Sequence, residues 1–527
     1  MSAPPRRFGG IGALFFIASL GAIAYYVQQQ EIPAERDLVR ASATVVAEEK
    51  PQEEHVDALP WRDRLDLTAA TLVPLGAAAP APGDPAGGDA DAPAIDPASS
   101  RMVQELGDGH RILYTIDPVL QDTALQIFRG REVPYAGAVI LDVRDNAVLA
   151  FAGHSSMDAQ VDPLEILTTA WAPAASTFKL VTAAALLKNK RANGKTKECF
   201  SGGLHGLTDE MLTDNPARDT RCESLSSAIA HSHNIVMAKL ALKHLDSQAL
   251  LDAAKSVGFE RDIPFELPIE RSPAHIPAEP RERAKVAAGF WHVDMSPIHG
   301  ALMASVFARG GVYQPPHLVA QVLGPDGSDR TPQLPDIERT LPKEAARAVG
   351  SMMVGTTTEG TARKSFKDNS GVPYINGVKV AGKTGSLTGK KAPALNYNWF
   401  VGYAPAENPE IAFAVLLANE PKWRIKAHYA ARRLVQVYFE RRDAIREHSS
   451  ARLTSDGRVM LPQSEAKAAP VVAQAAPTPS ADPSQGSSEP ATETLPPPPK
   501  PAPSRDDDLP PVPGPVAKGT NPLPSQG

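Results

Sequence analysis

Cysteines and aromatic residues are scarce in this chain of 527 residues, which has two cysteines and only 6% Phe, Trp and Tyr. Two cysteines are too few for a disulfide-rich scaffold, and they lack the neighbouring ligands that a zinc site needs. We therefore expect neither a bound metal nor a cofactor. The net charge is −6, and no long basic run with interleaved aromatic residues occurs, which argues against nucleic acid as a partner.

Proline, in contrast, is abundant, with 51 residues. Many of them stand in tracts rich in Ala and Ser, a composition that cannot bury a core. Residues 28–109 predict a partly disordered stalk, because residues 76–100 consist largely of Ala, Pro, Gly and Asp. Residues 446–527 predict a disordered Pro/Ala/Ser-rich tail. One packed domain, over residues 110–445, is left between them.

One long apolar run stands near the N-terminus, at residues 8–27, with two arginines before it. About twenty apolar residues suffice to cross a bilayer core. This pattern predicts a retained, single-pass anchor in the inner (cytoplasmic) membrane, with residues 1–7 in the cytoplasm and the main domain in the periplasm. A cleaved signal peptide is the alternative, because Ala22-Ile-Ala24 resembles a cleavage site. The run continues past that site, which favours the anchor.

An exported domain changes the expectation for the two cysteines. Cys199 and Cys222 bracket one loop-like stretch rich in Gly and Asp. In an oxidising compartment two such cysteines can form a disulfide, and two free thiols are the alternative.

Hydrophobic periodicity over residues 110–445 predicts a sheet assembled from distant segments and covered by helices on both faces. Strands are expected at residues 110–118, 136–143, 147–153, 377–386, 398–403 and 411–417. Helices are expected at residues 119–129, 177–190, 224–230, 235–245, 284–309, 343–354 and 426–442.

The first candidate catalytic residues stand at the start of the helix predicted at 177–190. Ser176 and Lys179 stand three residues apart, so the hydroxyl and the amine share one helical face. A serine becomes a nucleophile when a neighbouring base takes its proton, and a lysine with a lowered pKa can do so. The spacing alone is weak evidence, because Ser464 and Lys467 show it in the proline-rich tail without any supporting element.

Two further short motifs follow in chain order. Ser232-His-Asn234 interrupts two apolar helical segments, and capping of the second helix is its ordinary structural explanation. Lys383-Thr-Gly-Ser386 lies on a predicted strand that leads into two more strands. Each motif alone is common, but three in this order and context form a specific set.

With these motifs the chain resembles the penicillin-binding protein transpeptidases, serine acyltransferases that share a fold with the serine β-lactamases. The resemblance covers roughly residues 110–440 and is closest to monofunctional, class B-like members. It also rests on segments outside the three motifs, namely Leu113–Pro118, Met295–Pro297, Ala308–Gly311, Gly360–Ala362 and Trp399–Gly402. It implies an α/β fold with a mixed, largely antiparallel sheet flanked by helices.

The resemblance also implies roles for the motif residues. Ser176 would attack the bond between two D-alanines of a peptidoglycan stem peptide, with Lys179 as the base and the charge of Lys383 nearby. Ser232 would pass a proton to the leaving nitrogen, and Asn234 would orient Lys179 and the substrate amide.

The remaining roles concern the strand motif. Thr384 and Ser386 would bind the terminal carboxylate, and Gly385 would let the strand edge approach the substrate backbone. Backbone N–H groups of Ser176 and Ser386 would form the oxyanion hole.

Several functions fit these expectations. The first is a D,D-transpeptidase acting on stem peptides, inhibited by β-lactam antibiotics and working beside a membrane glycosyltransferase. A D,D-carboxypeptidase, a β-lactamase or a β-lactam sensor would use the same fold. A non-catalytic cell-wall scaffold is the alternative from another class, and the intact motifs argue against it. The segment before residue 110 is too short and too poor in core-forming residues for a glycosyltransferase domain.

Overall fold

The computed structural model describes residues 93–96, 99–158, 160–203, 206–290, 292–389, 394–420 and 424–461. All of them belong to one compact unit within residues 1–464. The predicted anchor at residues 8–27 lies outside the described residues. Within the described part, no helix is long and apolar enough to cross a membrane.

The central element is a five-stranded antiparallel sheet in the order β13-β14-β15-β4-β5. Its strands are β13 (Ala381–Thr388), β14 (Asn396–Ala404), β15 (Ile411–Asn419), β4 (Tyr135–Asp142) and β5 (Val148–Ser155). β4 therefore pairs with β15, which lies more than 250 residues later in the chain, and β5 pairs with β4 at the edge of the sheet. This confirms the largely antiparallel sheet built from distant segments.

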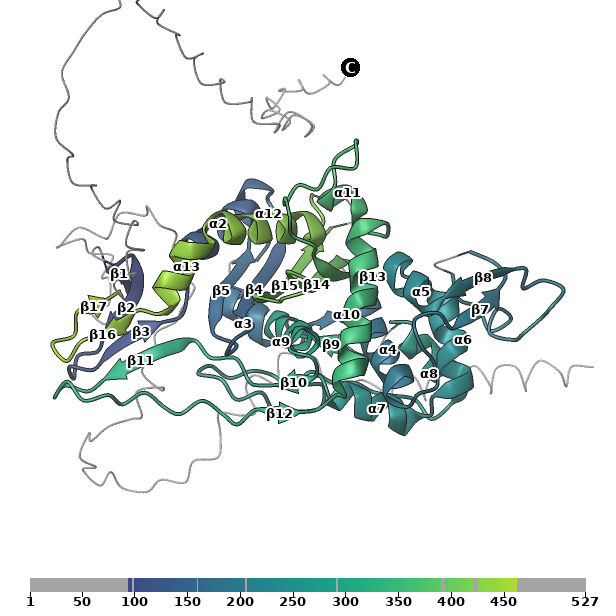
Figure 1. The fold of residues 1–527 in the computed structure, drawn as a ribbon, viewed down its shortest axis with the longest axis horizontal. Coiled ribbons are helices and arrows are strands. Elements are labelled where there is room, and N and C mark those ends of the chain that lie inside the picture. The colour runs from purple at the N-terminus through teal and green to yellow at the C-terminus, as the bar shows by residue number, and fades with distance from the viewer. Residues whose placement is uncertain are drawn as a thin grey trace, which may run out of the picture. The chain divides into compact units, whose positions relative to one another are not determined.

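Helices cover both faces of this sheet, because alternate side chains of its strands point to opposite sides. On β4, Ala138 and Ile140 join one apolar cluster, while Val139 and Leu141 join another. α2 (Pro118–Gly130) and α12 (Ala427–Glu440) pack on the first face, and α9 (Pro297–Ala308) packs on the second (Figure 1). α10 (Lys343–Thr358) packs against the edge strand β13.

A helical lobe stands beside the β13 edge, at the right of Figure 1. Its helices are α4 (Lys179–Lys188), α5 (Leu225–His231), α6 (Asn234–His244), α7 (Ser247–Lys255) and α8 (Pro280–Ala287). α4 is almost entirely buried within it. The smaller elements are α3 (Pro163–Thr168), β6 (Ala172–Pro173), η2 (Ala175–Phe178), β7 (Lys197–Phe200), β8 (Arg221–Ser224), β9 (Asp294–Met295), β10 (Val312–Tyr313), β12 (Glu338–Arg339), α11 (Arg363–Phe366) and α13 (Arg442–Ser449).

Some of the described strands lie outside residues 110–445, the range predicted for the packed domain. A second sheet has the order β1-β2-β3-β11, and a hairpin of two short strands packs on β11. These elements are β1 (Ala94–Asp96), β2 (Arg101–Glu105), β3 (Arg111–Tyr114), β11 (Val319–Leu323), β16 (Arg452–Leu453) and β17 (Val459–Met460). The short apolar stretches around Val103 and Leu453 were too brief to predict strands. They are nevertheless buried together in one apolar cluster.

The segment expected to be mostly helical, 284–309, is divided between two separate helices, α8 and α9. Gly289 between them has φ +90°, which an α-helix cannot accommodate. Ser296 caps α9 by accepting a hydrogen bond from the backbone N–H of His299, and Pro297 occupies its first turn. A Ser-Pro helix start was therefore present in the sequence.

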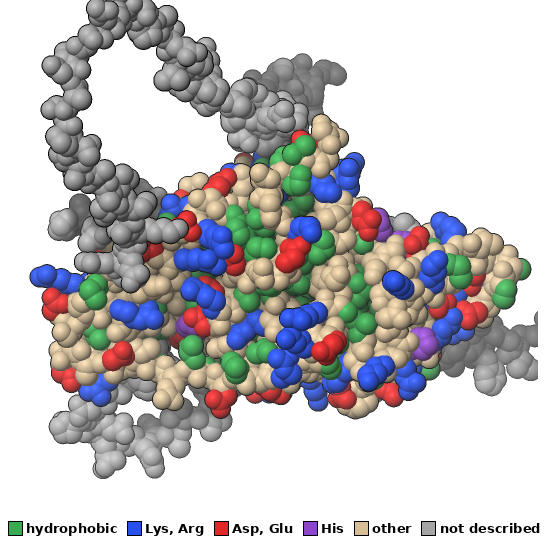
Figure 2. All heavy atoms as spheres, in the orientation of Figure 1, with side chains coloured by type: hydrophobic (Ala, Val, Ile, Leu, Met, Phe, Trp, Pro, Cys, Tyr) green, Lys and Arg blue, Asp and Glu red, His purple; other side chains and the backbone are tan. Residues whose placement is uncertain are grey.

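The surface drawn in Figure 2 carries intermixed acidic and basic side chains, with apolar groups scattered between them. On the described residues of this face, neither sign of charge dominates a continuous area.

Candidate active site

Ser176 lies at the junction between a short strand and a buried helix. β6 pairs with β9, the 3₁₀ turn η2 carries Ser176, and α4 begins at Lys179 rather than at the expected residue 177. Ala175, directly before the serine, has φ +50°. A left-handed conformation at alanine costs roughly 1–2 kcal/mol, and such strain is typical of functional sites. The buried Phe178 and α4 hold this turn in place.

Lys179 is fully buried and faces three oxygen atoms. Its Nζ lies 2.7 Å from Ser176 Oγ, 2.7 Å from Asn234 Oδ1 and 2.6 Å from the carbonyl oxygen of Ala288. Burial lowers the pKa of Lys179 well below its usual value, and the nearby charge of Lys383 lowers this pKa further. The predicted pairing of Ser176 with Lys179 is therefore present in the structure, with an amine that loses its proton readily.

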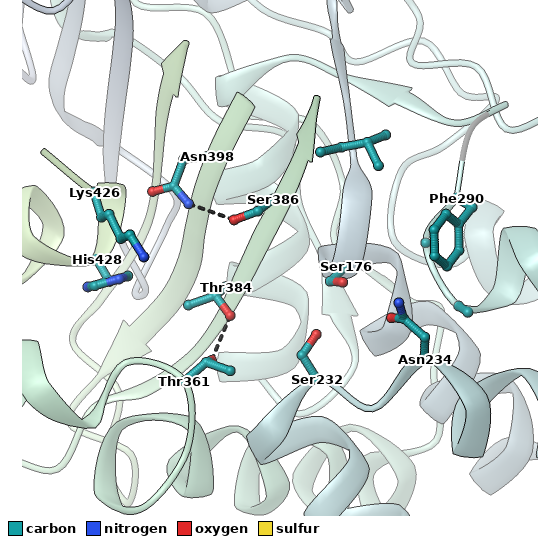
Figure 3. Close-up of a pocket in the computed structure, with 13 residues that line it drawn as sticks. Ser176, Ser232, Asn234, Phe290, Thr361, Thr384, Ser386, Asn398, Lys426 and His428 are labelled. Atoms are coloured by element: carbon teal, nitrogen blue, oxygen red, sulfur yellow. Dashed lines mark hydrogen bonds between the residues drawn. The ribbon is translucent and has the colours of Figure 1, made fainter. Parts of the chain in front are cut away.

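Ser232 and Asn234 approach the same place from the end of one helix and the start of the next. Ser232 ends α5 in a left-handed conformation, with φ 58° and ψ 44°. α6 begins at Asn234 with His233 as its N-cap, so neither Ser232 nor Asn234 caps it. The capping explanation for this motif is wrong. The kink instead places the Ser232 side chain at the cavity and Asn234 against Lys179 (Figure 3).

The third motif lies on β13, the edge strand of the main sheet. Lys383 is fully buried, its Nζ donates to the carbonyl oxygen of Thr384 at 2.9 Å, and burial lowers its pKa to about 7. Thr384 and Ser386, two residues apart, point to the same side and line the cavity.

The absence of a side chain at Gly385 also matters for packing inside the protein. A Cβ atom there would lie 3.0 Å from Thr177 Cγ2 and 3.3 Å from the carbonyl oxygen of Ala174. The absent side chain therefore lets β13 pack closely against the turn that carries Ser176.

The three motifs converge on an open cavity of about 500 Å³. Figure 3 shows the hydroxyl groups of Ser176, Ser232, Thr384 and Ser386 around one space. The complete lining is Ser176, Ser232, Asn234, Ala288, Gly289, Phe290, Thr361, Thr384, Ser386, Leu387, Asn398, Lys426 and His428.

Sequence reasoning missed several of these residues. Thr361 and Asn398 stand within or beside segments that carried the family resemblance, so a signal for them existed. The Ala288 carbonyl, Lys426 and His428 had no such signal, because a backbone acceptor and two residues at the start of α12 look ordinary in the sequence.

The two cysteines lie away from this cavity. Cys199 on β7 and Cys222 on β8 form a disulfide across directly opposed strand positions. Lys239 of α6 donates to the Cys199 carbonyl oxygen at 2.8 Å and forms an ion pair with Asp219 at 2.7 Å. The disulfide therefore joins the two strands of the hairpin, and Lys239 holds this hairpin against the helix that begins with Asn234.

Gly289 offers a test of how this site is positioned. A Cβ atom at Gly289 would lie 2.4 Å from the carbonyl oxygen of Ala175, next to Ser176. We expect Gly289→Ala to displace the Ser176 turn, lowering both the melting temperature and the rate of acylation by a fluorescent penicillin. Overpacking of this kind costs about 1–3 kcal/mol. Gly371→Ala is the matched control, because Gly371 has a similar φ of +83° but no atom near the added Cβ. Equal effects of the two substitutions would contradict this explanation.

An antiparallel sheet between helical layers, with a serine and a buried lysine beside its edge strand, is the arrangement of serine acyl-transferring enzymes. The family model described as "Penicillin binding protein transpeptidase domain" matches residues 136–436. This chain therefore belongs to the penicillin-binding protein transpeptidase family.

Named relatives agree with this assignment. The chain is 26% identical over 345 residues to the peptidoglycan D,D-transpeptidase PbpA of Mycobacterium tuberculosis, covering 59% of this chain and 68% of that protein. It is 24% identical over 387 residues to the peptidoglycan D,D-transpeptidase MrdA of Haemophilus influenzae, covering 63% of this chain and 57% of that protein.

Solved structures share the fold. The D,D-transpeptidase domain of a peptidoglycan glycosyltransferase from Eggerthella lenta has a TM-score of 0.53 and 23% identity, covering 63% of this chain and 84% of that one. The imipenem acyl-enzyme complex of penicillin-binding protein A from M. tuberculosis has a TM-score of 0.51 and 22% identity, covering 63% of this chain and 80% of that one.

Proposed function

We propose that this protein is a peptidoglycan D,D-transpeptidase that acts through an acyl-enzyme on Ser176 and is acylated by β-lactams. The observation that carries the proposal is the 2.7 Å approach of a fully buried lysine amine to Ser176 Oγ. Family membership and the names of the relatives support the same reaction.

Acylation begins with the neutral form of Lys179. A neutral amine has two N–H donors and one lone pair. The amide oxygen of Asn234 and the carbonyl of Ala288 can only accept, so they take the two N–H groups. The lone pair is then left for the Ser176 hydroxyl, whose proton moves to Lys179 as Oγ attacks the carbonyl between the two D-alanines.

The carbonyl oxygen becomes negatively charged during this attack. β13 is an edge strand, so backbone groups on its outer side are unpaired with β14. We assign the backbone N–H groups of Ser176 and Ser386 to the oxyanion hole. One such donor is worth about 3–4 kcal/mol in a comparable enzyme.

Collapse of the intermediate needs a proton on the leaving nitrogen. Ser232 is the proposed donor, because its hydroxyl faces the cavity next to Ser176 (Figure 3). The last D-alanine then leaves, while its carboxylate is held by Thr384 and Ser386 with Lys383 behind them. An amine from a second stem peptide attacks the acyl-enzyme to form the cross-link, and attack by water instead would make the protein a D,D-carboxypeptidase.

The proposal includes a location and a domain layout. Residues 8–27 would anchor the protein in the inner membrane, residues 28 to about 92 would form the stalk, and the catalytic domain would stand in the periplasm. The tail after residue 461 would extend from that domain. A membrane glycosyltransferase that supplies glycan strands is the partner this layout suits.

The test is labelling of wild type, Ser176→Ala and Ser464→Ala with a fluorescent penicillin. We expect equal labelling of wild type and Ser464→Ala, and none of Ser176→Ala. Ser464 is the matched control, because it shares the Ser-x-x-Lys spacing but belongs to the tail. Absence of label on the folded wild type would favour the scaffold alternative. Loss of the label from wild type within minutes would favour a β-lactam hydrolase.

A further inference from the structure

Asn398 lies behind the carboxylate end of the cavity and holds one of its hydroxyl groups. It stands on β14 directly opposite Ser386 on β13, and only 2% of it is exposed. Its Nδ2 donates to Ser386 Oγ at 2.9 Å and to the carbonyl oxygen of Gly385 at 3.3 Å. Its Oδ1 accepts from the backbone N–H of Ala427 at 2.6 Å.

These contacts determine the orientation of the Asn398 amide. A backbone N–H can only donate, so the amide atom that faces Ala427 has to be the oxygen. The NH₂ group therefore faces Ser386 and donates into its oxygen. Because the Ser386 hydroxyl cannot donate back to this NH₂ group, its own proton is directed elsewhere. Ser386 is exposed to the cavity, where a substrate carboxylate can accept that proton.

The hydroxyl of Thr384, the second hydroxyl at the carboxylate end, also has a hydrogen-bond partner. Thr361 Oγ1 lies 2.7 Å from Thr384 Oγ1, and the backbone N–H of Thr361 donates to the carbonyl of Ala230 at 3.1 Å. A carboxylate is only an acceptor, so a bound carboxylate requires Thr384 to donate to it. Thr361 then donates to Thr384, and the two hydroxyls form a polarised chain.

We propose that Asn398 and Thr361 are positioning residues that direct the hydroxyl protons of Ser386 and Thr384 toward the terminal carboxylate of the substrate. The inference rests on the proposed function and adds to it. Ala427 is the first residue of α12, so the Asn398 amide also links the positive end of a 14-residue helix to the carboxylate site. Each residue would act on the substrate through the hydroxyl group that it holds.

The test compares a ligand that has the carboxylate with one that lacks its charge. Acylation rates of wild type, Asn398→Ala and Thr361→Val are measured by intact-protein mass spectrometry with benzylpenicillin and with its methyl ester. A hydrogen bond to a charged group is worth about 1.5–3 kcal/mol. We therefore expect Asn398→Ala to lower the rate with the acid at least about ten-fold, while the rate with the ester changes less than about two-fold. Thr361→Val is expected to act in the same direction.

A double-mutant cycle separates positioning from general damage. In a Ser386→Ala background, Asn398→Ala should have little further effect on the rate with the acid, because the hydroxyl it positions is gone. Equal losses with acid and ester, or additive effects in the cycle, would overturn the proposal. If Asn398→Ala fails to fold, Thr361→Val in a Thr384→Ala background decides, since Thr361 is an exposed loop residue. Failure of wild type to react with either ligand would instead contradict the proposed function.

Discussion

Lys179→Met is expected to slow acylation of Ser176 by about 10²–10⁴-fold, the usual contribution of a general base. Methionine fills the same space but cannot accept the serine proton. In wild type, the base works only when neutral, so the rate should rise with pH through the lowered pKa of Lys179, which lies well below 10.5. This rise should disappear in the variant.

The measurement is the second-order rate constant for a fluorescent penicillin between pH 5 and 9. Lys188→Met is the control, because Lys188 lies on the same helix with an exposed side chain. Melting temperatures establish that both variants fold. A folded Lys179→Met protein with nearly wild-type acylation would show that another group takes the proton.

Lys383→Met is expected to reduce activity and increase stability. The Lys383 amine is fully buried, and its pKa falls to about 7. Removal of the amine next to the carboxylate site should lower the acylation rate by about 10–100-fold. This factor corresponds to the free energy that one hydrogen bond to a charged group contributes. Replacement of a buried ion pair by apolar residues of similar volume is often neutral or stabilising by about 1–4 kcal/mol, and we expect a change in the same direction when a buried amine is replaced. A group kept for function at a cost in stability is typical of active sites.

The pH dependence of the free energy of unfolding tests the expected gain in stability. Lys383 has a pKa of about 7 in the folded state and an ordinary value of 10.5. Between these values the unfolded chain binds a proton that the folded chain lacks, so wild-type stability should rise with pH from about 7 upward. Lys383→Met should reduce this rise, and the part that remains is expected from the lowered pKa of Lys179. Lys379→Met is the control, since Lys379 lies just before β13 but is exposed and forms an ion pair with Glu407. Lower stability in Lys383→Met would contradict the account.

The sequence was informative where periodicity and spacing are local. The apolar hairpin at 136–153 predicted β4 and β5, and the Ser176-x-x-Lys179 spacing predicted a serine and an amine on one face. The three motifs come together because β13, η2 and the α5–α6 junction meet at one edge of the sheet. Only the family resemblance, and not the spacing within any one motif, indicated that meeting.

Other features depended on contacts that no local pattern reports. Gly289 breaks an apparently continuous helical segment so that the Ala288 carbonyl can face Lys179. Asn398 looks like an ordinary strand residue until β13 and α12 are placed on either side of it. The strands on either side of the predicted domain were missed for a similar reason, since stretches as short as 101–105 are stabilised by burial against one another and have little periodicity of their own.

The most direct test of the account is to find where a β-lactam becomes attached. Wild-type protein is treated with benzylpenicillin and digested, and the modified peptide is sequenced by mass spectrometry. We predict a single penicilloyl group on the hydroxyl of Ser176, and none on the same time scale when Lys179 is replaced by methionine. An adduct on Ser232, on Ser464 or on any other residue, with Ser176 unmodified, would contradict it.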